Sequence, residues 1–373
     1  MRRVSVRKVT SEKVQKWRCK KCRKYFTFRK NISRQQFTKV FIKEAVKDFI
    51  QGRSSFAVIR QRKGVSVGTL SSWVNDFGVR CMSPVEIAHI LGFNIANRWS
   101  GILLLDAKYL NKKMSLLLAV DYLTLDVVAH LVVSAETEGN YIRLVDMVEE
   151  CGYEIKAIIS DGDPAILALT KPKKQVFVRK GTRRYPRPGI KPAVKVRARL
   201  ENIPHQWCCV HAERNLATKL SKLSKKRKLY LRKLIHSILF ANTLAGAKRQ
   251  MRKLVDATRN NPGLHEQITL WIDDGWDMLM LHHTLRVNGR KIPRTSNTIE
   301  NTISYINTRL KTLRRLRSYA SARKITNLIV VNYRTKPLVN TKNKLKRGKC
   351  PLALVTGEKR MFDWMEFVKK PDA

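Results

Sequence analysis

Four short runs of apolar and β-branched residues constrain the fold of this chain more than any other feature of its 373 residues. They cover residues 102–105, 114–120, 127–133 and 155–159. Runs of this length and composition are typical of β-strands with a buried face. Helical periodicity over residues 138–150 separates the third run from the fourth. This order indicates an α/β fold with a mixed sheet flanked by helices.

Two acidic residues come where strand runs end. Asp106 follows the first run directly, and Asp161 closes the fourth. The run before Asp106 has no polar alternation, which indicates a strand buried on both faces, where an isolated carboxylate is costly unless a cation compensates it. Either acid alone is more often a turn former. As a pair, they could face each other across adjacent strands.

Glu300 is the third candidate acid. It lies near the start of a helix expected from about residue 297 to 316, one turn before Ile303, so its side chain can point toward the core. The alternative is a surface glutamate favoured by the dipole at the helix N-terminus. If Glu300 converges with Asp106 and Asp161 at the carboxyl edge of the sheet, their oxygens suit Mg²⁺ or Mn²⁺ rather than zinc.

A Cys-x-x-His element, Cys208 and His211, continues into Arg214 and Asn215. Two ligands do not complete a tetrahedral zinc site, so we predict a structural or DNA-positioning role near the carboxylates. The alternative is a buried cysteine with a hydrogen-bonded histidine. Three aspartates are weaker candidates for metal ligands, because hairpin or capping roles are the better prediction for them: Asp121, Asp126 and Asp163. Trp271 and Trp276 could stack on an unpaired base, but a helix-core role is the better prediction.

The chain is strongly basic. It has 76 Lys and Arg against 28 Asp and Glu, a net charge of +48, and self-repulsion on this scale favours a polyanionic partner such as nucleic acid. No apolar run reaches the length that spans a bilayer, so we predict a cytoplasmic, DNA-associated protein without membrane contact. Residues 171–204 form a basic insert, which we expect to be irregular and either a solvated loop or an arm that follows DNA.

A Cys-x-x-Cys pair, Cys19 and Cys22, has aromatic residues on both sides, as in half of a zinc ribbon. Residues 1–18 contain neither Cys nor His, so two of the four ligands of a structural zinc are absent. Either the start of the chain is truncated or the site is defunct, and zinc is not expected in the chain as given. The seven cysteines are irregularly spaced, which does not indicate a disulfide framework.

Helical periodicity between residues 37 and 77 predicts three helices. Gly64 and Val65 predict a turn, after which Ser66 can cap the last helix, and this is the layout of a helix-turn-helix unit that reads DNA. A helical hairpin without a DNA role is the alternative. The residues expected to contact DNA are those of the last helix and of a basic late helix: Ser66, Thr69, Ser71, Ser72, Arg309, Lys311, Arg314 and Arg315.

The order of Asp106, Asp161, the Cys208–His211 element and Glu300 resembles that of the Mutator-type DDE transposases of insertion sequences and eukaryotic Mutator elements. The likeness covers roughly residues 35–330. Residues 206–216 resemble the family's Cys-x-x-His followed by Arg-Asn. Residues 295–300, which include Asn297, resemble its third-carboxylate motif.

This resemblance implies an RNase H-like core interrupted by an all-helical insertion domain. It implies a DNA transposase that cleaves and joins strands with two Mg²⁺ or Mn²⁺ ions, held by Asp106 as the bridging ligand and by Asp161 and Glu300. Cys208, His211, Arg214, Asn215 and Asn297 are expected near the site. The partners implied are double-stranded DNA, at element ends and target, and at least a second copy of the chain.

The expected organisation has six parts: a partial zinc-ribbon-like segment at 1–34, a helix-turn-helix at 35–80, the first part of the core at 98–211, the helical insertion at 212–290, the C-terminal core helices at 291–335 and a loosely ordered basic tail at 336–373. Two alternative functions are kept. One is a domesticated, non-catalytic DNA-binding regulator, and the other is a different RNase H-like nuclease such as a junction resolvase.

Overall fold

The structure is a computed structural model that describes residues 2–9, 12–18, 20–23, 25–27, 37–92, 98–171, 173–175, 194–196, 198–313, 316, 318–339, 341 and 343–370. The chain divides into two compact units, Met1–Glu44 and Ala45–Ala373. The first holds an antiparallel sheet of β1 (Arg2–Val9), β2 (Glu12–Arg18) and β3 (Tyr25–Thr27). Cys22 is exposed between β2 and β3, and Cys19 lies outside the described residues.

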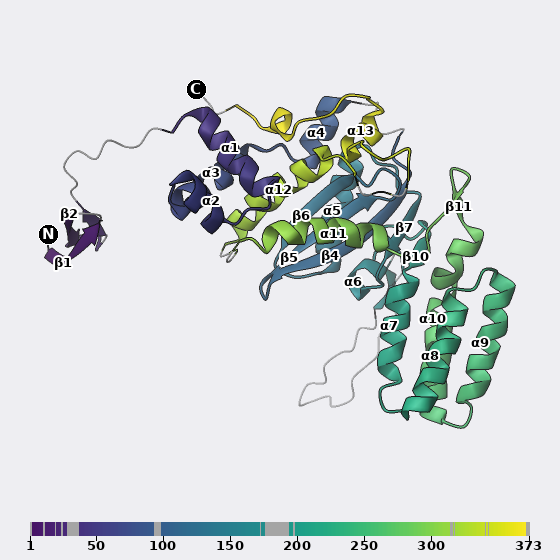
Figure 1. Cartoon of the computed structure of the whole chain (residues 1–373). Helices are drawn as coiled ribbons and strands as arrows, with labels where there is room; N and C mark the ends of the chain where they lie inside the picture. Colours follow the sequence, from purple (N-terminus) through teal and green to yellow (C-terminus); the bar gives the residue numbers. More distant parts are fainter. Residues whose placement is uncertain are drawn as a thin grey trace. The chain divides into compact units, whose positions relative to one another are not determined.

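The second unit is built on a five-stranded mixed sheet (Figure 1). Its strands are β4 (Ile102–Asn111), β5 (Met114–Asp121), β6 (Val127–Val133), β7 (Ala157–Ser160) and β10 (His205–Trp207), in the order β10-β7-β4-β5-β6. β4, β5 and β6 are antiparallel, whereas β7 and β10 run parallel to β4. The mixed α/β sheet expected from the four apolar runs is confirmed. β10 was not expected, because three residues carry too little periodicity.

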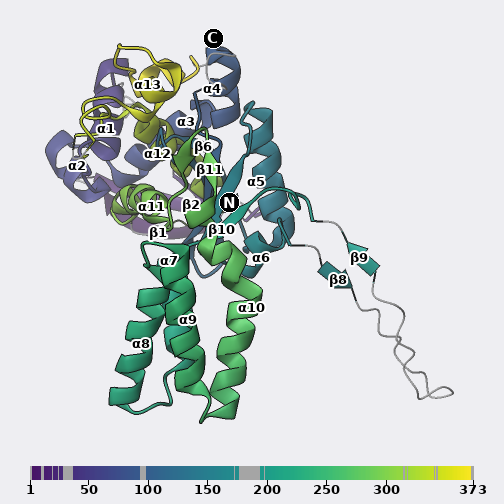
Figure 2. The same ribbon diagram turned by 90° about the vertical axis from the view of Figure 1, so that its right-hand side faces the viewer.

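Helices cover both faces of this sheet (Figure 2). α5 (Glu138–Glu150) and α4 (Pro84–Leu91) bury one face, where Leu105, Leu117 and Ala119 join the core. On the other face α11 (Asn297–Leu310) packs against β4, and α12 (Tyr319–Thr335) packs against β6. Because side chains alternate along a strand, residues such as Leu104 and Asp106 point to the α11 side.

Three helices precede this core, as expected. They are α1 (Lys39–Ile50), which crosses the boundary between the two units, α2 (Phe56–Lys63) and α3 (Val67–Arg80). Gly64 ends α2 in the left-handed conformation, with φ 68°, and Ser66 caps α3 by accepting from the Thr69 N–H. α3 packs along α12 so closely that a Cβ on Gly78 would lie 2.3 Å from the Lys324 carbonyl oxygen.

An all-helical region separates β10 from α11. It consists of α7 (Cys209–Lys219), α8 (Lys225–Leu239), α9 (Leu244–Thr258) and α10 (Pro262–Thr284), and it has its own apolar core. A small hairpin, β11 (Arg286–Val287) and β12 (Arg290–Lys291), follows. Its turn, Asn288-Gly289, has φ 49° and 74°, as hairpin turns of this type require.

The basic insert after α6 (Pro164–Leu167) is less irregular than expected at its base. There β8 (Lys173–Gln175) pairs antiparallel with β9 (Val194–Val196). Residues 176–193 lie outside the part of the chain that the structure describes. The insert therefore has a paired stem, which its density of Lys, Arg and Pro did not indicate.

The expectation of a loosely ordered tail after residue 336 was wrong. The tail contains α13 (Pro351–Thr356) and the 3-10 helix η1 (Trp364–Phe367), and the apolar residues of these two helices are mostly buried, whereas Val339, Leu345 and Met361 are exposed. Val355 joins the core of the sheet, and the Trp364 ring lies 5.9 Å from that of Phe77 on α3. These apolar residues have no regular spacing, so only their burial shows that they pack. Among the described residues, no helix is both long and apolar enough to cross a membrane.

Candidate functional site

Asp106 and Asp161 come from neighbouring strands. In the parallel pairing of β4 with β7, Leu105 lies opposite Ser160. The acid is the next residue after Leu105 and after Ser160, so the two aspartates are adjacent at this edge of the sheet. Because side chains alternate between the two faces of a sheet, both lie on the face covered by α11. One expectation was wrong: β4 does not end at Asp106 but continues to Asn111, because it stays paired with β5 beyond the end of β7.

The Asp106 carboxylate is in an unfavourable electrostatic environment. Burial and the Asp161 carboxylate raise the pKa of Asp106 to about 7, with a smaller contribution from Glu300 in the same direction. The Ala107 N–H, which donates to Asp106 Oδ1 over 2.7 Å, and the His211 side chain act in the opposite direction. Burial also raises the pKa of Asp161. Close, partly buried carboxylates of this kind are stabilised by a cation.

A glycine turn fixes the backbone of Asp161. The Trp207 indole N–H donates to the Asp161 carbonyl over 2.7 Å, and the Asp163 N–H donates to Asp161 Oδ1 over 3.0 Å. Gly162 has φ 86°, and a Cβ there would lie 2.1 Å from Trp207 Nε1. Only glycine fits this position, so the turn and the tryptophan together determine where Asp161 lies.

Cys208 joins the loops before two helices. Its N–H donates to the Ser160 carbonyl over 2.8 Å, and its sulfur accepts from the Ser296 N–H over 3.3 Å. The Cys209 N–H donates to the Arg294 carbonyl over 2.9 Å. These bonds hold the start of α11 beside the start of α7. Although burial favours the neutral thiol, hydrogen bonds involving His211 and Ser296 lower the pKa of Cys208 below its ordinary value.

His211 faces Glu300. Its Nε2 lies 3.8 Å from Glu300 Oε1. The Glu300 side chain is 39% exposed, yet its Oε1 is buried and has no hydrogen-bond partner among the described residues. A hydrogen bond with Cys208, opposed by burial, raises the pKa of His211, and the carboxylates of Asp161 and Asp106 raise it further. His211 is therefore electrostatically coupled to all three acids.

The donor chemistry fits divalent cations, but the side chains are not arranged as a finished metal site. Within the described ranges, no three His, Cys, Asp or Glu side chains are grouped so that they could hold one metal ion. Three features nevertheless favour a cation here: hard oxygen donors, the raised pKa values of Asp106 and Asp161, and the buried Oε1 of Glu300, which accepts no hydrogen bond from the described residues. Asp106, Asp161 and Glu300 are the residues that could hold it.

Glu136 was missed by the sequence analysis. It precedes α5, and burial followed by the nearby carboxylates of Asp163 and Asp161 raises its pKa, while hydrogen bonds with Tyr109 and Ser115 oppose the rise. It is thus a further acid at this edge of the sheet, beside Asp161 and Asp163. No motif surrounds it, so nothing in the sequence set it apart from a loop residue.

The three weaker aspartate candidates have structural roles, although for Asp126 the role is an ion pair rather than the hairpin or cap role expected. Asp121 is fully buried and accepts from Ser100, Thr124 and Tyr153. Asp126 forms a buried ion pair with Arg334. Asp163 caps α6 through the Ala165 N–H. The preferred helix-core role of Trp271 also holds, since it is buried and its ring lies 6.3 Å from that of Trp207. Trp276 packs against the same core.

The other residues expected near the carboxylates lie on the two helices that Cys208 connects. Arg214 and Asn215 are exposed on α7, and Asn297 is exposed as the first residue of α11. None of the three has a described hydrogen bond to Asp106, Asp161 or Glu300. Their roles stay predictions.

The residues expected to bind DNA fall into two groups. On α3, Ser72 is exposed, Ser71 is half-buried, and the Ser66 and Thr69 hydroxyls bond each other over 2.8 Å within the helix cap. In the second group the structure contradicts the expected exposure of Arg309, which is only 1% exposed and whose guanidinium lies 3.6 Å from the centre of the Tyr305 ring. Lys311 is exposed, and Arg314 and Arg315 lie outside the described residues.

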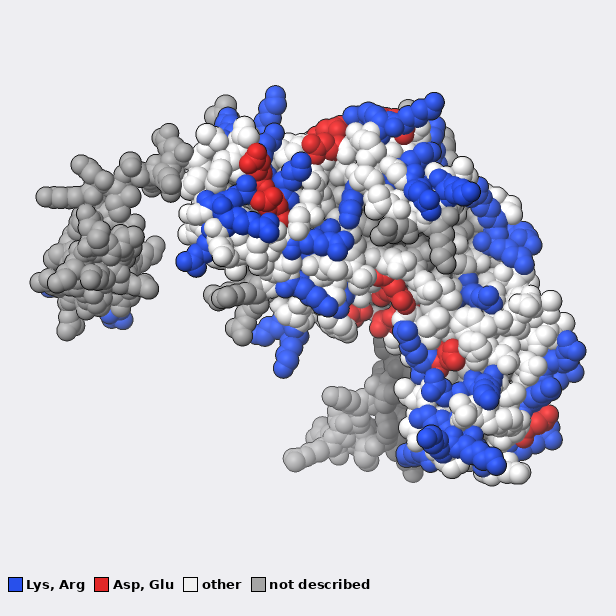
Figure 3. All heavy atoms as spheres, in the orientation of Figure 1, with Lys and Arg blue, Asp and Glu red and all other residues white. Residues whose placement is uncertain are grey.

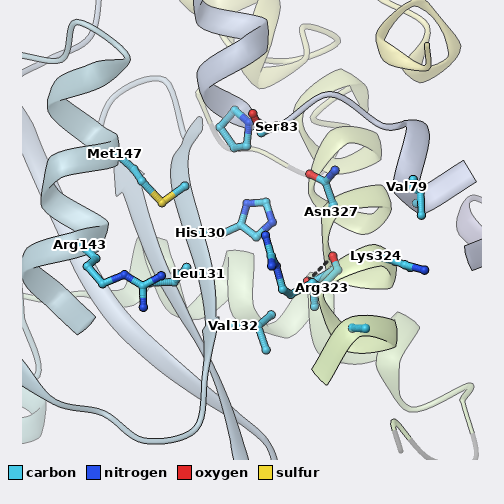
Figure 4. Close-up of a pocket in the computed structure, with 14 residues that line it drawn as sticks. Val79, Ser83, His130, Leu131, Val132, Arg143, Met147, Arg323, Lys324 and Asn327 are labelled. Atoms are coloured by element: carbon cyan, nitrogen blue, oxygen red, sulfur yellow. Dashed lines mark hydrogen bonds between the residues drawn. The ribbon is translucent and has the colours of Figure 1, made fainter. Parts of the chain in front are cut away.

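Charge is unevenly distributed on the surface. Figure 3 shows a small acidic patch near the centre of one face, surrounded by many Lys and Arg side chains. A basic cavity of about 500 Å³ lies between β6, α5, α3 and α12 (Figure 4). His130, Arg143, Arg323 and Lys324 line it. It contains none of the residues expected in the site.

Residues 189–336 match the family described as "Transposase, Mutator family". The match includes the Cys208–His211 element, the helical region and Glu300, and it begins after Asp106 and Asp161. No curated protein matches the chain. Over residues 189–336, this chain is therefore similar to the Mutator family of transposases.

Proposed function

We propose that the protein is a DNA transposase that cleaves and joins DNA strands with divalent metal ions held by Asp106, Asp161 and Glu300. One observation carries the proposal: residues from β4, β7 and α11, far apart in sequence, form a single electrostatically coupled group around His211. Sequence spacing does not force this convergence, since a whole helical region lies between Asp161 and Glu300.

The proposed fold of the core is RNase H-like. Its support is the sheet order β10-β7-β4-β5-β6, with β4 to β6 antiparallel, α5 after β6, and β7 returning parallel to β4. The proposed DNA-reading unit is α2 and α3, supported by the tight turn at Gly64 and the capped start of α3. Because α3 also packs along α12, only its exposed side, which includes Ser72, is available to DNA.

The roles of the residues follow from their positions. The carboxylates of Asp161 and Glu300 both raise the pKa of Asp106. Because Asp106 interacts with both of the other acids, it is the proposed shared ligand. Mg²⁺ or Mn²⁺, when bound, would activate the attacking hydroxyl and stabilise the leaving oxygen of the phosphodiester. His211 holds the Glu300 side chain from the α7 side and supplies positive charge near the acids. Cys208 positions both helix starts.

The basic surface supports a DNA substrate. A net charge of +48 favours a polyanion that offsets the self-repulsion of the chain, and on the visible face in Figure 3 Lys and Arg side chains are more widespread than Asp and Glu. A transposase must hold two element ends and a target, so we propose that at least two copies of the chain act together in the DNA complex.

A strand-transfer assay tests this function against its rivals. The substrates are linear DNA with the terminal inverted repeats that flank the gene, and a supercoiled target, with Mg²⁺ or Mn²⁺. We expect cleavage at the ends and joined products. A junction resolvase would cut branched DNA without joining it, and a domesticated regulator would bind the ends without cutting, so either result would contradict the proposal.

A further inference from the structure

Arg309 is a buried cation that forms no ion pair with a carboxylate of the described residues. It is 1% exposed, and its described contacts are to neutral groups: Nε donates to the Ile50 carbonyl over 3.4 Å, and Nη1 donates to the Thr308 hydroxyl over 2.8 Å. Its Nη2 has no partner in the part of the chain that the structure describes. A buried charge of this kind is destabilising unless an opposite charge compensates it.

Two more cations lie close to it. The Lys336 ammonium and the Arg309 guanidinium lie over the ring of Tyr305, 5.0 Å and 3.6 Å from its centre. Burial, followed by repulsion from Arg309 and Arg53, lowers the pKa of Lys336. None of the ion pairs found among the described residues includes Arg53, Arg309 or Lys336. The ring of Tyr305 offsets only a small part of this repulsion.

A cavity of about 700 Å³ opens beside this group, next to α11. Its charged lining consists of Arg53, Lys336 and Lys346, and no Asp or Glu is among the described residues that line it. α11 presents a row of uncharged donors to the cavity, spaced three or four residues apart, namely Thr298, Asn301, Ser304 and Thr308.

The lining selects the class of ligand. Three cations, with no acid among the described lining residues, do not suit a metal ion. The lining also includes the apolar Leu125, Leu338 and Val339, but an apolar partner would leave the cations and the polar row along α11 without hydrogen-bond partners. A phosphate group would compensate the cations and accept hydrogen bonds from the hydroxyl, amide and ammonium donors. We propose that this cavity binds a phosphate group of a nucleic acid strand, held by Arg53, Lys336 and Lys346, and that the phosphate charge also compensates the neighbouring buried Arg309.

This site would act on the helix that carries Glu300. A phosphate at the cavity neutralises the repulsion around Tyr305 and so stabilises α11 in its place against β4. Choosing a DNA strand as the source of the phosphate rests on the proposed function, whereas the phosphate chemistry of the cavity does not. A free phosphate compound shares that chemistry, so the test has one arm for each source.

The first arm measures thermal unfolding of the full chain with and without inorganic phosphate, using chloride at equal ionic strength as the reference. The test variant is Lys336→Gln/Lys346→Gln, and the matched control is Lys344→Gln, a nearby exposed lysine that does not line the cavity. We expect phosphate to raise Tm in the wild type and the control, and the rise to be at least halved in the test variant. An equal rise in all three proteins would overturn the proposal.

The second arm measures binding of a DNA duplex by anisotropy over a range of salt concentrations. Loss of phosphate contacts should make the negative slope of log K against log salt less steep in the test variant, by roughly one per lost contact. The slope of the control should equal that of the wild type. If phosphate stabilises the wild type but the slopes agree, nucleic acid is not the ligand. If Lys344→Gln reduces the phosphate-induced rise in Tm and the salt dependence of DNA binding as much as the test variant does, only general charge is involved and the site is refuted. Neither arm depends on DNA cleavage, so the catalytic proposal stands or falls separately.

Discussion

The imidazole of His211 on α7 lies 3.8 Å from the carboxylate of Glu300 on α11, Nε2 to Oε1. This contact joins the two ends of the helical region, since α7 begins it and α11 follows it. Cys208 reinforces the same connection through the Ser296 N–H. The late glutamate therefore lies beside the Cys-x-x-His element, which fits the structural role predicted for that element.

Gly162→Ala should destabilise the protein, because a Cβ at φ 86° would lie 2.1 Å from the Trp207 indole nitrogen. We expect a loss of about 1–3 kcal/mol or more in the free energy of unfolding, measured by denaturant titration. Gly139→Ala is the matched control, because a Cβ there meets nothing within 4 Å and the residue lies in α5. Equal stability of the two variants would refute the role of the glycine turn.

The buried His205 should make stability fall in acid. Its ring nitrogens lie 2.8 Å from the Ser160 hydroxyl and 2.9 Å from that of Thr170, and burial lowers its pKa to about 4. The unfolded pKa is near 6.5, so the contribution is complete above pH 6.5 and lost as the pH falls toward 4. We expect His205→Asn to have a lower free energy of unfolding than the wild type at pH 7. On acidification from pH 6.5 toward pH 4, this free energy should fall less steeply than in the wild type, by up to about 1.4 kcal/mol per pH unit. The exposed His89→Asn should keep the wild-type pH dependence.

The Arg334–Asp126 pair should be strongly coupled. Its Nε–Oδ1 distance is 2.7 Å, and the two side chains are 1% and 0% exposed. Removing one partner leaves a buried charge, so Arg334→Met and Asp126→Asn should each cost about 3–5 kcal/mol, and the double variant should cost clearly less than their sum. The exposed Arg259–Asp256 pair provides the comparison, with an expected coupling below about 1 kcal/mol. Additive costs at the buried pair would contradict this account.

DNA binding should depend steeply on salt. If six or more phosphates are contacted, the affinity should fall by about 10³-fold or more between 50 and 200 mM salt. The reason is that Lys and Arg side chains that bind phosphates release the counterions condensed on the DNA. The measurement is a titration of one duplex at several salt concentrations. A nearly flat response would remove the argument from the net charge of +48.

The parts of the fold with strong local patterns were predictable. The runs that became β4 to β7 are apolar over most of their length, and the caps at Ser66 and Gly64 follow from local chemistry. β10 and the β8–β9 stem were not predictable, because three-residue strands are defined by their partners rather than by their own composition. The packing of the tail around Trp364 was not predictable for the same reason, since it depends on a contact with Phe77, which is distant in sequence.

At the site, the candidate acids could be named from the sequence, but their environment could not. The extension of β4 past Asp106 depends on pairing with β5, and the closeness of Glu136 depends on how β6 leads into α5. Arg309 stands in a basic stretch that looks like a DNA-contacting surface, yet it is the residue that turns inward under Tyr305. Charge in a sequence does not show which side of a helix is buried.

The most direct test of the account is the rate of DNA cleavage by Asp106→Asn, measured with saturating Mg²⁺ or Mn²⁺ beside its DNA affinity. The substitution keeps the shape of the side chain but removes the charge of the proposed shared ligand. We predict that cleavage falls by about 10²-fold or more while the affinity for DNA changes little. Asp273→Asn, at an exposed position on α10, should cleave normally. If Asp106→Asn cuts its ends at the wild-type rate, the assignment of the three carboxylates is wrong.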